Sequence, residues 1–356
     1  IPLHERLEID LDALRQRIDL LHDLAQRGPL GVGRRQFLQF RAAFLQDGDA
    51  FRDHLLALRL DLALVLVDDG VHRGEHHLDI GEFHLVGERH PCVQAVAALD
   101  GYADGRDFPG KEHTSKLSPH LAFGEISPFQ IWAATEECRE EAPASDLTTF
   151  RKEVVWREFS WHLLVNFPDL RTENYNSDFD AFPWREPGEE LERWQKGKTG
   201  YPFIDAGMRQ LWQTGWMHNR VRMAVGSFLV KHLLIDWRHG ESWFRETLVD
   251  ADPGSNTASW QWIAGSGADA APYFRIFNPI LQGEKFDPKG SYVRQFVPEL
   301  ADMPDKYLHK PWEAPEATLR KAGVTLGETY PEPIVEHRGA RQRAMAAYEE
   351  MKSKSG

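Results

Sequence analysis

The amino-acid composition of this 356-residue chain changes sharply at Gly101. The first 101 residues contain no Ser, Thr, Asn, Lys, Tyr, Trp or Met, although Ser and Lys are among the commonest residues of globular domains. Because the chain also begins with Ile1, we expect residues 1–95 to be an unassigned segment of aberrant composition, translated in a wrong reading frame. A remnant of a real domain is the alternative. Residues 96–356 are therefore expected to form the folded domain.

The patterns within residues 1–95 do not indicate a function. Leucine and isoleucine recur at helical spacing over residues 7–24, and residues 62–67 and 78–80 suggest short strands, so the segment is α/β-like or poorly ordered. Five histidines lack the Cys or carboxylate spacing of a metal site, and we expect none; they are His72, His76, His77, His84 and His90. Cys92 and Cys138 are too few for a disulfide framework.

Bulk properties narrow the class of protein. No run of eighteen apolar residues and no basic region followed by a short apolar stretch occurs, so we expect no membrane association and a cytoplasmic location. The net charge of −13 argues against a generic nucleic-acid binder, and any DNA contact must be local. All 12 tryptophans lie between Trp132 and Trp312, which suits a core, an aromatic cofactor or stacked bases. Helical patterns dominate after Gly101, so the domain is expected to be mainly α.

Two motifs before residue 160 indicate binding. The first comprises YADGRDFP at 102–109 and TSKLSPHL at 114–121, where hydroxyls and free amides beside a helix start suit a pyrophosphate; a simple helix cap is the alternative. The second is EVVWREF at 153–159, which places Glu153, Trp156, Arg157 and Ser160 on one helical face. A half-buried helix with a core Trp and an i,i+4 pair between Glu153 and Arg157 is the alternative.

Two longer motifs carry a resemblance to a known family. They are KTGYPFIDAGMRQLWQTGWMHNRVRM at 198–223, and DADPGSNTASWQW at 250–262 continuing through DAAPYFRIFNP at 269–279. Together with the earlier motifs they resemble the flavin domain of the DNA photolyase and cryptochrome family, and within it the class I cyclobutane pyrimidine dimer photolyases. The resemblance spans residues 96–312 and implies an all-helical domain that binds FAD. It does not cover residues 1–95, so no antenna chromophore is assigned and an antenna-domain remnant is one interpretation of that segment.

The resemblance implies a role in FAD binding for eleven residues. They are Tyr102, Thr114, Ser115, Lys116, Leu117, Ser118, Arg157, Arg222, Asp250, Asp252 and Asn256. Asn256 would lie beside the flavin N5, and Arg222 paired with Asp250 would supply fixed charge near a ring that becomes anionic on reduction to FADH−. Trp260, Trp237 and Trp184 match the family's chain for electron transfer to the photoexcited flavin.

The implied substrate is UV-damaged DNA, with the lesion flipped out of the duplex by a monomeric protein. The matching residues are Arg106, Glu153, Trp156, Asn219, Arg220, Met223, Trp262, Arg275 and Gln282. The tryptophans would stack on the dimer and the arginines would bind phosphates. Glu153 would stabilise charge on the pyrimidine carbonyls if its pocket raises its pKa.

Two rival functions share the same domain. A (6-4) photolyase typically has histidines at the positions of Asn219 and Met223, which disfavours that activity here. A cryptochrome photoreceptor often changes the residue at Asn256 or loses the lesion-stacking aromatics, and this chain keeps Asn256, Trp156 and Trp262. The residues therefore favour repair of cyclobutane dimers.

Overall fold

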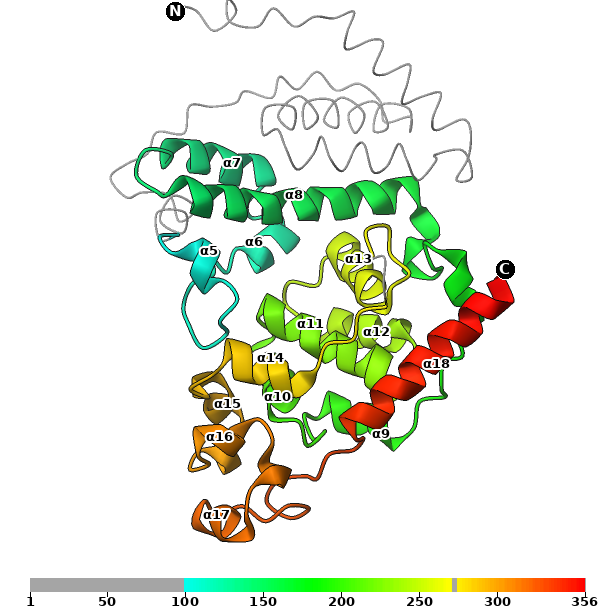
Figure 1. Ribbon diagram of the computed structural model, residues 1–356. Helices are drawn as coiled ribbons and strands as arrows, with labels where there is room; N and C mark the ends of the chain where they lie inside the picture. The colour runs from blue at the N-terminus through cyan, green and yellow to red at the C-terminus, as the bar shows by residue number, and fades with distance from the viewer. Residues whose placement is uncertain (1–98, 271–273, 356) are drawn as a thin grey trace, which may run out of the picture. The chain divides into compact units, whose positions relative to one another are not determined.

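The computed structural model describes residues 99–270 and 274–355, and all of them belong to one compact unit (Figure 1). The predictions for residues 1–95 concern a helix, strands, histidines and Cys92, and they lie outside the described residues. The boundary expected at residue 96 stays a prediction for the same reason.

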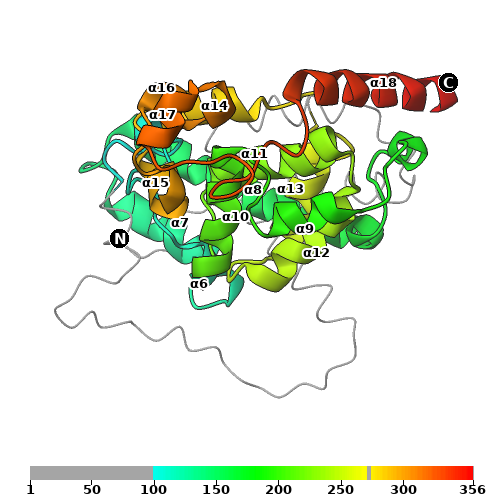
Figure 2. The same ribbon diagram turned by 90° about the horizontal axis from the view of Figure 1, so that it is seen from below.

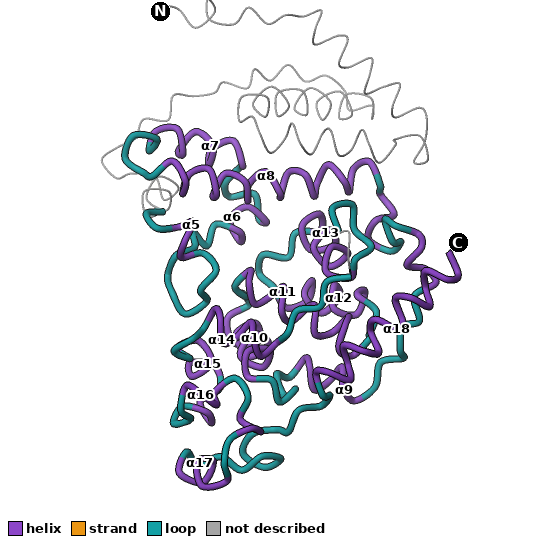
Figure 3. Tube along the Cα trace, in the orientation of Figure 1, coloured by secondary structure: helices purple, strands orange, loops and turns teal. Residues whose placement is uncertain are grey.

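The described part of the chain is helical, which confirms the expected mainly α fold. Its α-helices are α5 (Tyr102–Gly105), α6 (Ser118–Ala122), α7 (Pro128–Glu137), α8 (Ala144–Asn166), α9 (Glu189–Gln195), α10 (Pro202–Thr214), α11 (Asn219–Ser227), α12 (Trp237–Thr247), α13 (Pro253–Ala264), α14 (Pro279–Phe286), α15 (Ser291–Phe296), α16 (Asp305–Leu308), α17 (Glu316–Lys321) and α18 (His337–Ser355). Short 3₁₀ turns are η2 (Pro168–Arg171), η3 (Ser177–Ala181), η5 (Pro298–Leu300) and η6 (Pro311–Glu313), and η4 (Phe228–Leu233) is a π-helix. The described residues contain isolated β-bridges but no strand, as Figure 3 shows.

Local sequence signals set the ends of the two helices that carry the longest motifs. Pro202 and Pro253 occupy the first positions of α10 and α13, where a missing amide hydrogen has no cost. Gly215 and Gly265 follow their last residues with φ of 68° and 100°, a left-handed backbone that favours glycine. Asp252 accepts a hydrogen bond from the amide of Ser255 at 2.7 Å and so caps the start of α13.

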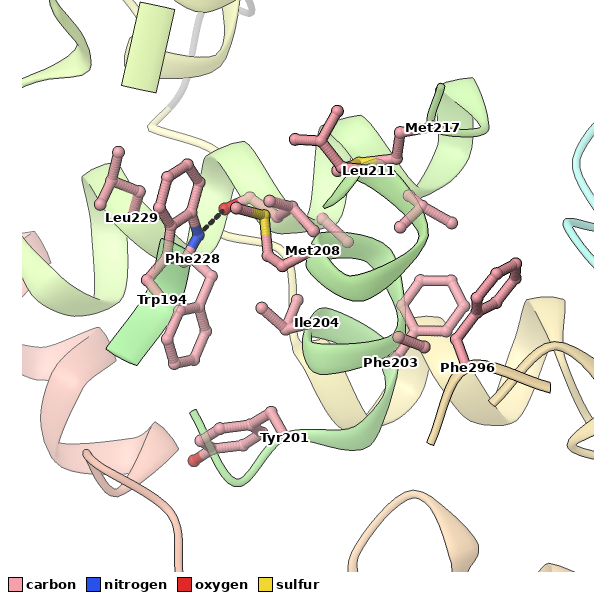
Figure 4. Packing of buried hydrophobic residues seen from close by; sticks show 14 of the residues in the cluster. Trp194, Tyr201, Phe203, Ile204, Met208, Leu211, Met217, Phe228, Leu229 and Phe296 are labelled. Atoms are coloured by element: carbon pink, nitrogen blue, oxygen red, sulfur yellow. Dashed lines mark hydrogen bonds between the residues drawn. The ribbon is translucent and has the colours of Figure 1, made fainter. Parts of the chain in front are cut away.

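The main core lies around α10 to α13. Helix α13 packs between α8 and α12, and α10 packs against α11 and α15 (Figures 1 and 2). Large side chains fill this core, among them Trp194, Phe203 and Phe228, and Figure 4 shows their packing. The indole of Trp194 donates to the carbonyl of Val225 at 3.1 Å, so its one polar atom is satisfied. Residues of the two longest motifs therefore form much of this core.

The C-terminal helix α18 packs against η3 and η4. A pair of imidazoles joins α18 to η4, since Nε2 of the buried His232 lies 2.9 Å from Nδ1 of the half-buried His337. Burial lowers the pKa of His232 to about 3. No helix in the described ranges is long and apolar enough to cross a bilayer.

Candidate functional site

The loop before α6 contains hydrogen-bond donors that suit a phosphate group. Within the described residues, no hydrogen bond engages the Thr114 hydroxyl or the backbone amides of Thr114 and Ser115. Lys116 has a φ of 53°, which is uncommon outside glycine and marks strain of the kind found at functional sites. Free donors held in a strained loop fit an anionic ligand.

Tyr102 and Asp146 anchor the segment that leads into this loop. The carboxylate of Asp146 accepts from the amides of Gly101 at 2.9 Å and Ala103 at 2.7 Å, and so fixes the start of α5 on α8. Tyr102 is buried against Phe150, and burial raises the pKa of its phenol to about 12. The phenol of Tyr102, an expected cofactor residue, is therefore buried in the core, with the Arg106 guanidinium 5.4 Å from the centre of its ring.

Asp250 connects the loop with α11. It accepts from the Ser118 hydroxyl at 2.6 Å and from Arg222 Nη2 at 2.8 Å and 3.0 Å. The side chain of Asp250 is 2% exposed and that of Arg222 is 25% exposed. The expected pair of Arg222 and Asp250 is thus present, and Ser118 joins it across 132 positions of sequence.

Asp252 connects α13 with α8. Its Oδ2 accepts from the Trp161 indole at 2.7 Å and lies 3.3 Å from Arg157 Nη2. Arg157 also pairs with Glu158 at 2.6 Å. The i,i+4 pair considered between Glu153 and Arg157 is not formed, because each residue has a different partner. Trp161 was missed as a site residue, although it follows Trp156 on the same long helix.

Asn256 lies on α13 and is held by Glu241 of α12. Its Nδ2 donates to the backbone carbonyl of Glu241 at 3.1 Å and to the carboxylate Oε1 at 3.0 Å. No hydrogen bond in the described part of the chain uses the Asn256 Oδ1. Sequence reasoning missed Glu241, and its position four residues after Trp237 on the same helical face was the available signal.

These groups fit FAD. Unpaired amides and a hydroxyl at residues 114–115 suit phosphates, whereas a free amide oxygen and a buried ion pair suit a polar heterocycle. The donors come from the loop before α6 and from α8, α11 and α13, and Asp250 and Asp252 tie these segments together. Among the described residues, no group of three or more His, Cys, Asp or Glu side chains is arranged to hold a metal ion.

The residues expected to bind DNA form several separate contacts. Glu153 forms an ion pair with Arg106, and this pair raises the pKa of the guanidinium although burial alone would lower it. Arg220 Nη2 lies 2.7 Å from Asp107. Trp156 is 37% exposed, consistent with a stacking surface. Asp107 was missed, although it directly follows Arg106.

The remaining residues that were expected to bind DNA differ in their exposure. Arg275 is exposed, with its guanidinium 5.9 Å from the centre of the Trp262 ring. Asn219 is exposed at the start of α11, and Met223 is half-buried one turn later beside the core. Gln282 lies on α14 with its Oε1 buried and unpaired among the described residues. Asn219 and Met223 are four residues apart on α11 and therefore lie on one face of that helix.

The three tryptophans of the expected electron-transfer chain all belong to the main core or pack against it. Trp260 and Trp237 are buried, and Trp184 is half-buried against the same cluster. Trp237 donates to Asn174 Oδ1 at 2.9 Å. The Trp260 ring lies directly on Gly240, where an added Cβ would be 2.1 Å from ring atom Cη2. Trp184 is thus the most exposed of the three, and their role in electron transfer stays a prediction.

Comparisons with known proteins identify the domain type. The family described as FAD binding domain of DNA photolyase matches residues 150–350. The deoxyribodipyrimidine photo-lyase of Agrobacterium fabrum is 64% identical over 255 residues, which cover 72% of this chain and 53% of that protein. The Escherichia coli deoxyribodipyrimidine photo-lyase is 49% identical over 250 residues, covering 70% and 52%.

A solved structure shows the same likeness in three dimensions. A bacterial class III photolyase from Agrobacterium tumefaciens superimposes with a TM-score of 0.72 at 62% identity, covering 74% of this chain and 55% of that one. The chain spans about half the length of the curated relatives it matches.

Proposed function

Because the chain belongs to the DNA photolyase and cryptochrome family, we propose that it binds FAD in its reduced form and uses light to repair cyclobutane pyrimidine dimers. The observation that carries this proposal is the position of Asp250. One buried carboxylate joins Ser118 of the phosphate-binding loop to Arg222 of α11, so the segments expected to hold the two ends of FAD meet there. The named relatives are photo-lyases, which supports repair as the activity.

In this proposal the chemistry supplied by bound FAD is light-driven transfer of an electron to the dimer, with no net redox change. The protein holds the cofactor and the lesion. The loop at 114–118 binds the phosphates with amide and hydroxyl donors, and the Arg222 guanidinium places positive charge beside the heterocycle. Fixed charges of this kind need no rearrangement during the reaction.

The lesion would be held by aromatic faces and polar edges. Trp156 and Trp262 stack on the extruded dimer, and Asn219 hydrogen-bonds a pyrimidine edge. Glu153 would donate or share a proton at a pyrimidine carbonyl, which requires that its carboxylate leave the ion pair with Arg106 and take up a proton from solvent. Arg275 and Arg220 would bind phosphates, which for Arg220 requires that its guanidinium leave the ion pair with Asp107.

The proposal also extends to subclass, partner and location. The motifs resemble those of class I photolyases, and the solved structure at 62% identity is described as a class III photolyase, so the proposed subclass is class I or class III. The partner is UV-damaged DNA, the protein acts as a monomer in the cytoplasm, and no antenna chromophore is assigned. The three tryptophans 260, 237 and 184 would carry electrons that restore reduced FAD.

One experiment separates repair from its rivals. The purified protein is tested for flavin absorbance and then illuminated with blue light in the presence of DNA that carries either cyclobutane dimers or (6-4) products. We expect bound FAD and light-dependent loss of cyclobutane dimers only. Loss of (6-4) products instead would indicate the other repair activity, and bound FAD without repair of either lesion would indicate a cryptochrome photoreceptor.

A further inference from the structure

Glu241 is a buried carboxylate with no role in the site as described so far. It lies on α12 and is 4% exposed. Its Oε1 and its backbone carbonyl both accept from Asn256 Nδ2, at 3.0 Å and 3.1 Å. Its Oε2 accepts from Arg245 Nη1 at 3.0 Å. A continuous polar chain therefore runs from Arg245 through Glu241 to Asn256.

This arrangement fixes the orientation of the Asn256 amide. The two groups of Glu241 that face the amide are both acceptors, so only the Asn256 NH₂ can satisfy them. The amide oxygen must then point away from Glu241. Turning the amide over would place its oxygen against two acceptor oxygens and leave buried groups unpaired, which is costly.

The ion pair between Glu241 and Arg245 does not explain why Glu241 is buried. The side chain of Arg245 is 46% exposed, and it also donates to the Ser242 hydroxyl at 3.0 Å. An exposed cation of this kind needs no buried partner, and a surface pair contributes little to stability. The feature that requires burial is the contact with Asn256.

We infer that Glu241 is a positioning residue that makes Asn256 accept, and not donate, a hydrogen bond at the cofactor. This inference rests on the proposed function, because it requires FAD to lie against the Asn256 Oδ1. The N5 atom of oxidised flavin carries only a lone pair, whereas N5 of reduced flavin carries a hydrogen. An acceptor fixed beside N5 therefore favours binding of reduced FAD over oxidised FAD.

The test is the midpoint potential of bound FAD in the Glu241→Met protein. Without the carboxylate, the Asn256 amide can turn and donate to oxidised flavin. Because the Glu241 carbonyl remains in every variant, the expected effect is partial. We expect the ratio of reduced to oxidised affinity to fall about fivefold, which lowers the potential by about 20 mV for a two-electron couple.

Two further variants show whether Glu241 acts through Asn256. In an Asn256→Ala background, adding Glu241→Met should leave the potential unchanged, because the residue it positions is gone. The conservative variant Glu241→Gln keeps an acceptor oxygen and should restore the wild-type potential. Glu246→Met is the matched control, since Glu246 is exposed on the same helix and accepts a hydrogen bond from the Ser242 hydroxyl.

The outcomes separate this inference from the proposed function. An equal shift in both backgrounds would show that Glu241 acts by its own charge, and an unchanged potential in Glu241→Met would show no positioning role; either result overturns the inference alone. Wild-type protein that binds no FAD would overturn the proposed function together with it. If Glu241→Met does not fold, Glu241→Ala, which also removes the carboxylate, is measured in the same two backgrounds, and an unchanged potential in the presence of Asn256 overturns the inference.

Discussion

Lys231 is a buried lysine with no ion-pair partner among the described residues. Its replacement tests whether the pKa of this lysine is lower in the folded protein than in the unfolded chain. The side chain is 1% exposed in η4. Its Nζ donates to the carbonyl of Ala264 at the end of α13 and lies 3.3 Å from the centre of the Phe274 ring. No carboxylate in residues 99–270 or 274–355 forms an ion pair with it. Burial holds the pKa of Lys231 well below its usual range.

The sign of the resulting pH dependence follows from proton linkage. The unfolded chain binds a proton at this lysine up to about pH 10.4, whereas the folded protein releases it above its lowered pKa. The unfolded state thus binds more protons between these two values, and the free energy of unfolding rises with pH across that window. One proton contributes about 1.4 kcal/mol per pH unit, or about 2.7 kcal/mol over two units.

The Lys231→Met variant removes this proton while keeping an unbranched side chain. We expect its free energy of unfolding to lack the rise, so the difference from wild type should change by about 1.4 kcal/mol per pH unit. At the lower end of the window the variant should be at least as stable as wild type, because a buried ionisable group is replaced by an apolar one.

Urea unfolding at pH 7, 8 and 9 measures this difference, with FAD in the same saturating concentration throughout. Lys354→Met is the control, since Lys354 is exposed on α18 and forms a surface ion pair with Glu350; its effect should stay within about 0.5 kcal/mol at every pH. A constant difference between Lys231→Met and wild type across the three pH values would refute the reasoning, because it would mean that Lys231 stays charged in the folded protein.

Three further predictions concern the site and its support. Trp237→Phe should abolish photoreduction of oxidised FAD, measured by flavin absorbance under blue light, and an unchanged rate would show that Trp237 is only a core residue. Asp250→Leu should destabilise the protein by about 3 kcal/mol in urea unfolding, because it leaves Arg222 without its buried partner; a loss under about 1 kcal/mol would mean that water replaces the carboxylate. Gly240→Ala should cost about 1–3 kcal/mol, because its Cβ would overlap the Trp260 ring, and a thermal midpoint equal to wild type would contradict that packing.

The helices and their ends were largely predictable, because they depend on neighbours in sequence. The N-cap residue Asp252 immediately precedes α13, and a glycine follows the last residue of α10 and of α13. Both are signals that can be found in the local sequence. The shared face of Asn219 and Met223 also follows from helical periodicity alone.

The partners of the site residues were less predictable. Glu153 and Arg157 are four residues apart and suit each other by local rules, yet Glu153 pairs with Arg106 and Arg157 with Asp252. These contacts join residues 47 and 95 positions apart, and they depend on how helices pack. The resemblance identified Arg222 and Asp250 as a pair, but not Glu241, whose importance is visible only in its contact with Asn256.

The most direct test of the proposed function is the number of dimers repaired for each bound flavin. Protein with fully reduced FAD is mixed anaerobically with an excess of an oligonucleotide that carries one cyclobutane dimer, and the flavin spectrum and the remaining dimers are followed in light and in darkness. We predict many dimers repaired per flavin in light, none in darkness, and an unchanged reduced-flavin spectrum. Repair in darkness, or loss of one reduced flavin for each dimer repaired, would contradict light-driven repair without net redox change.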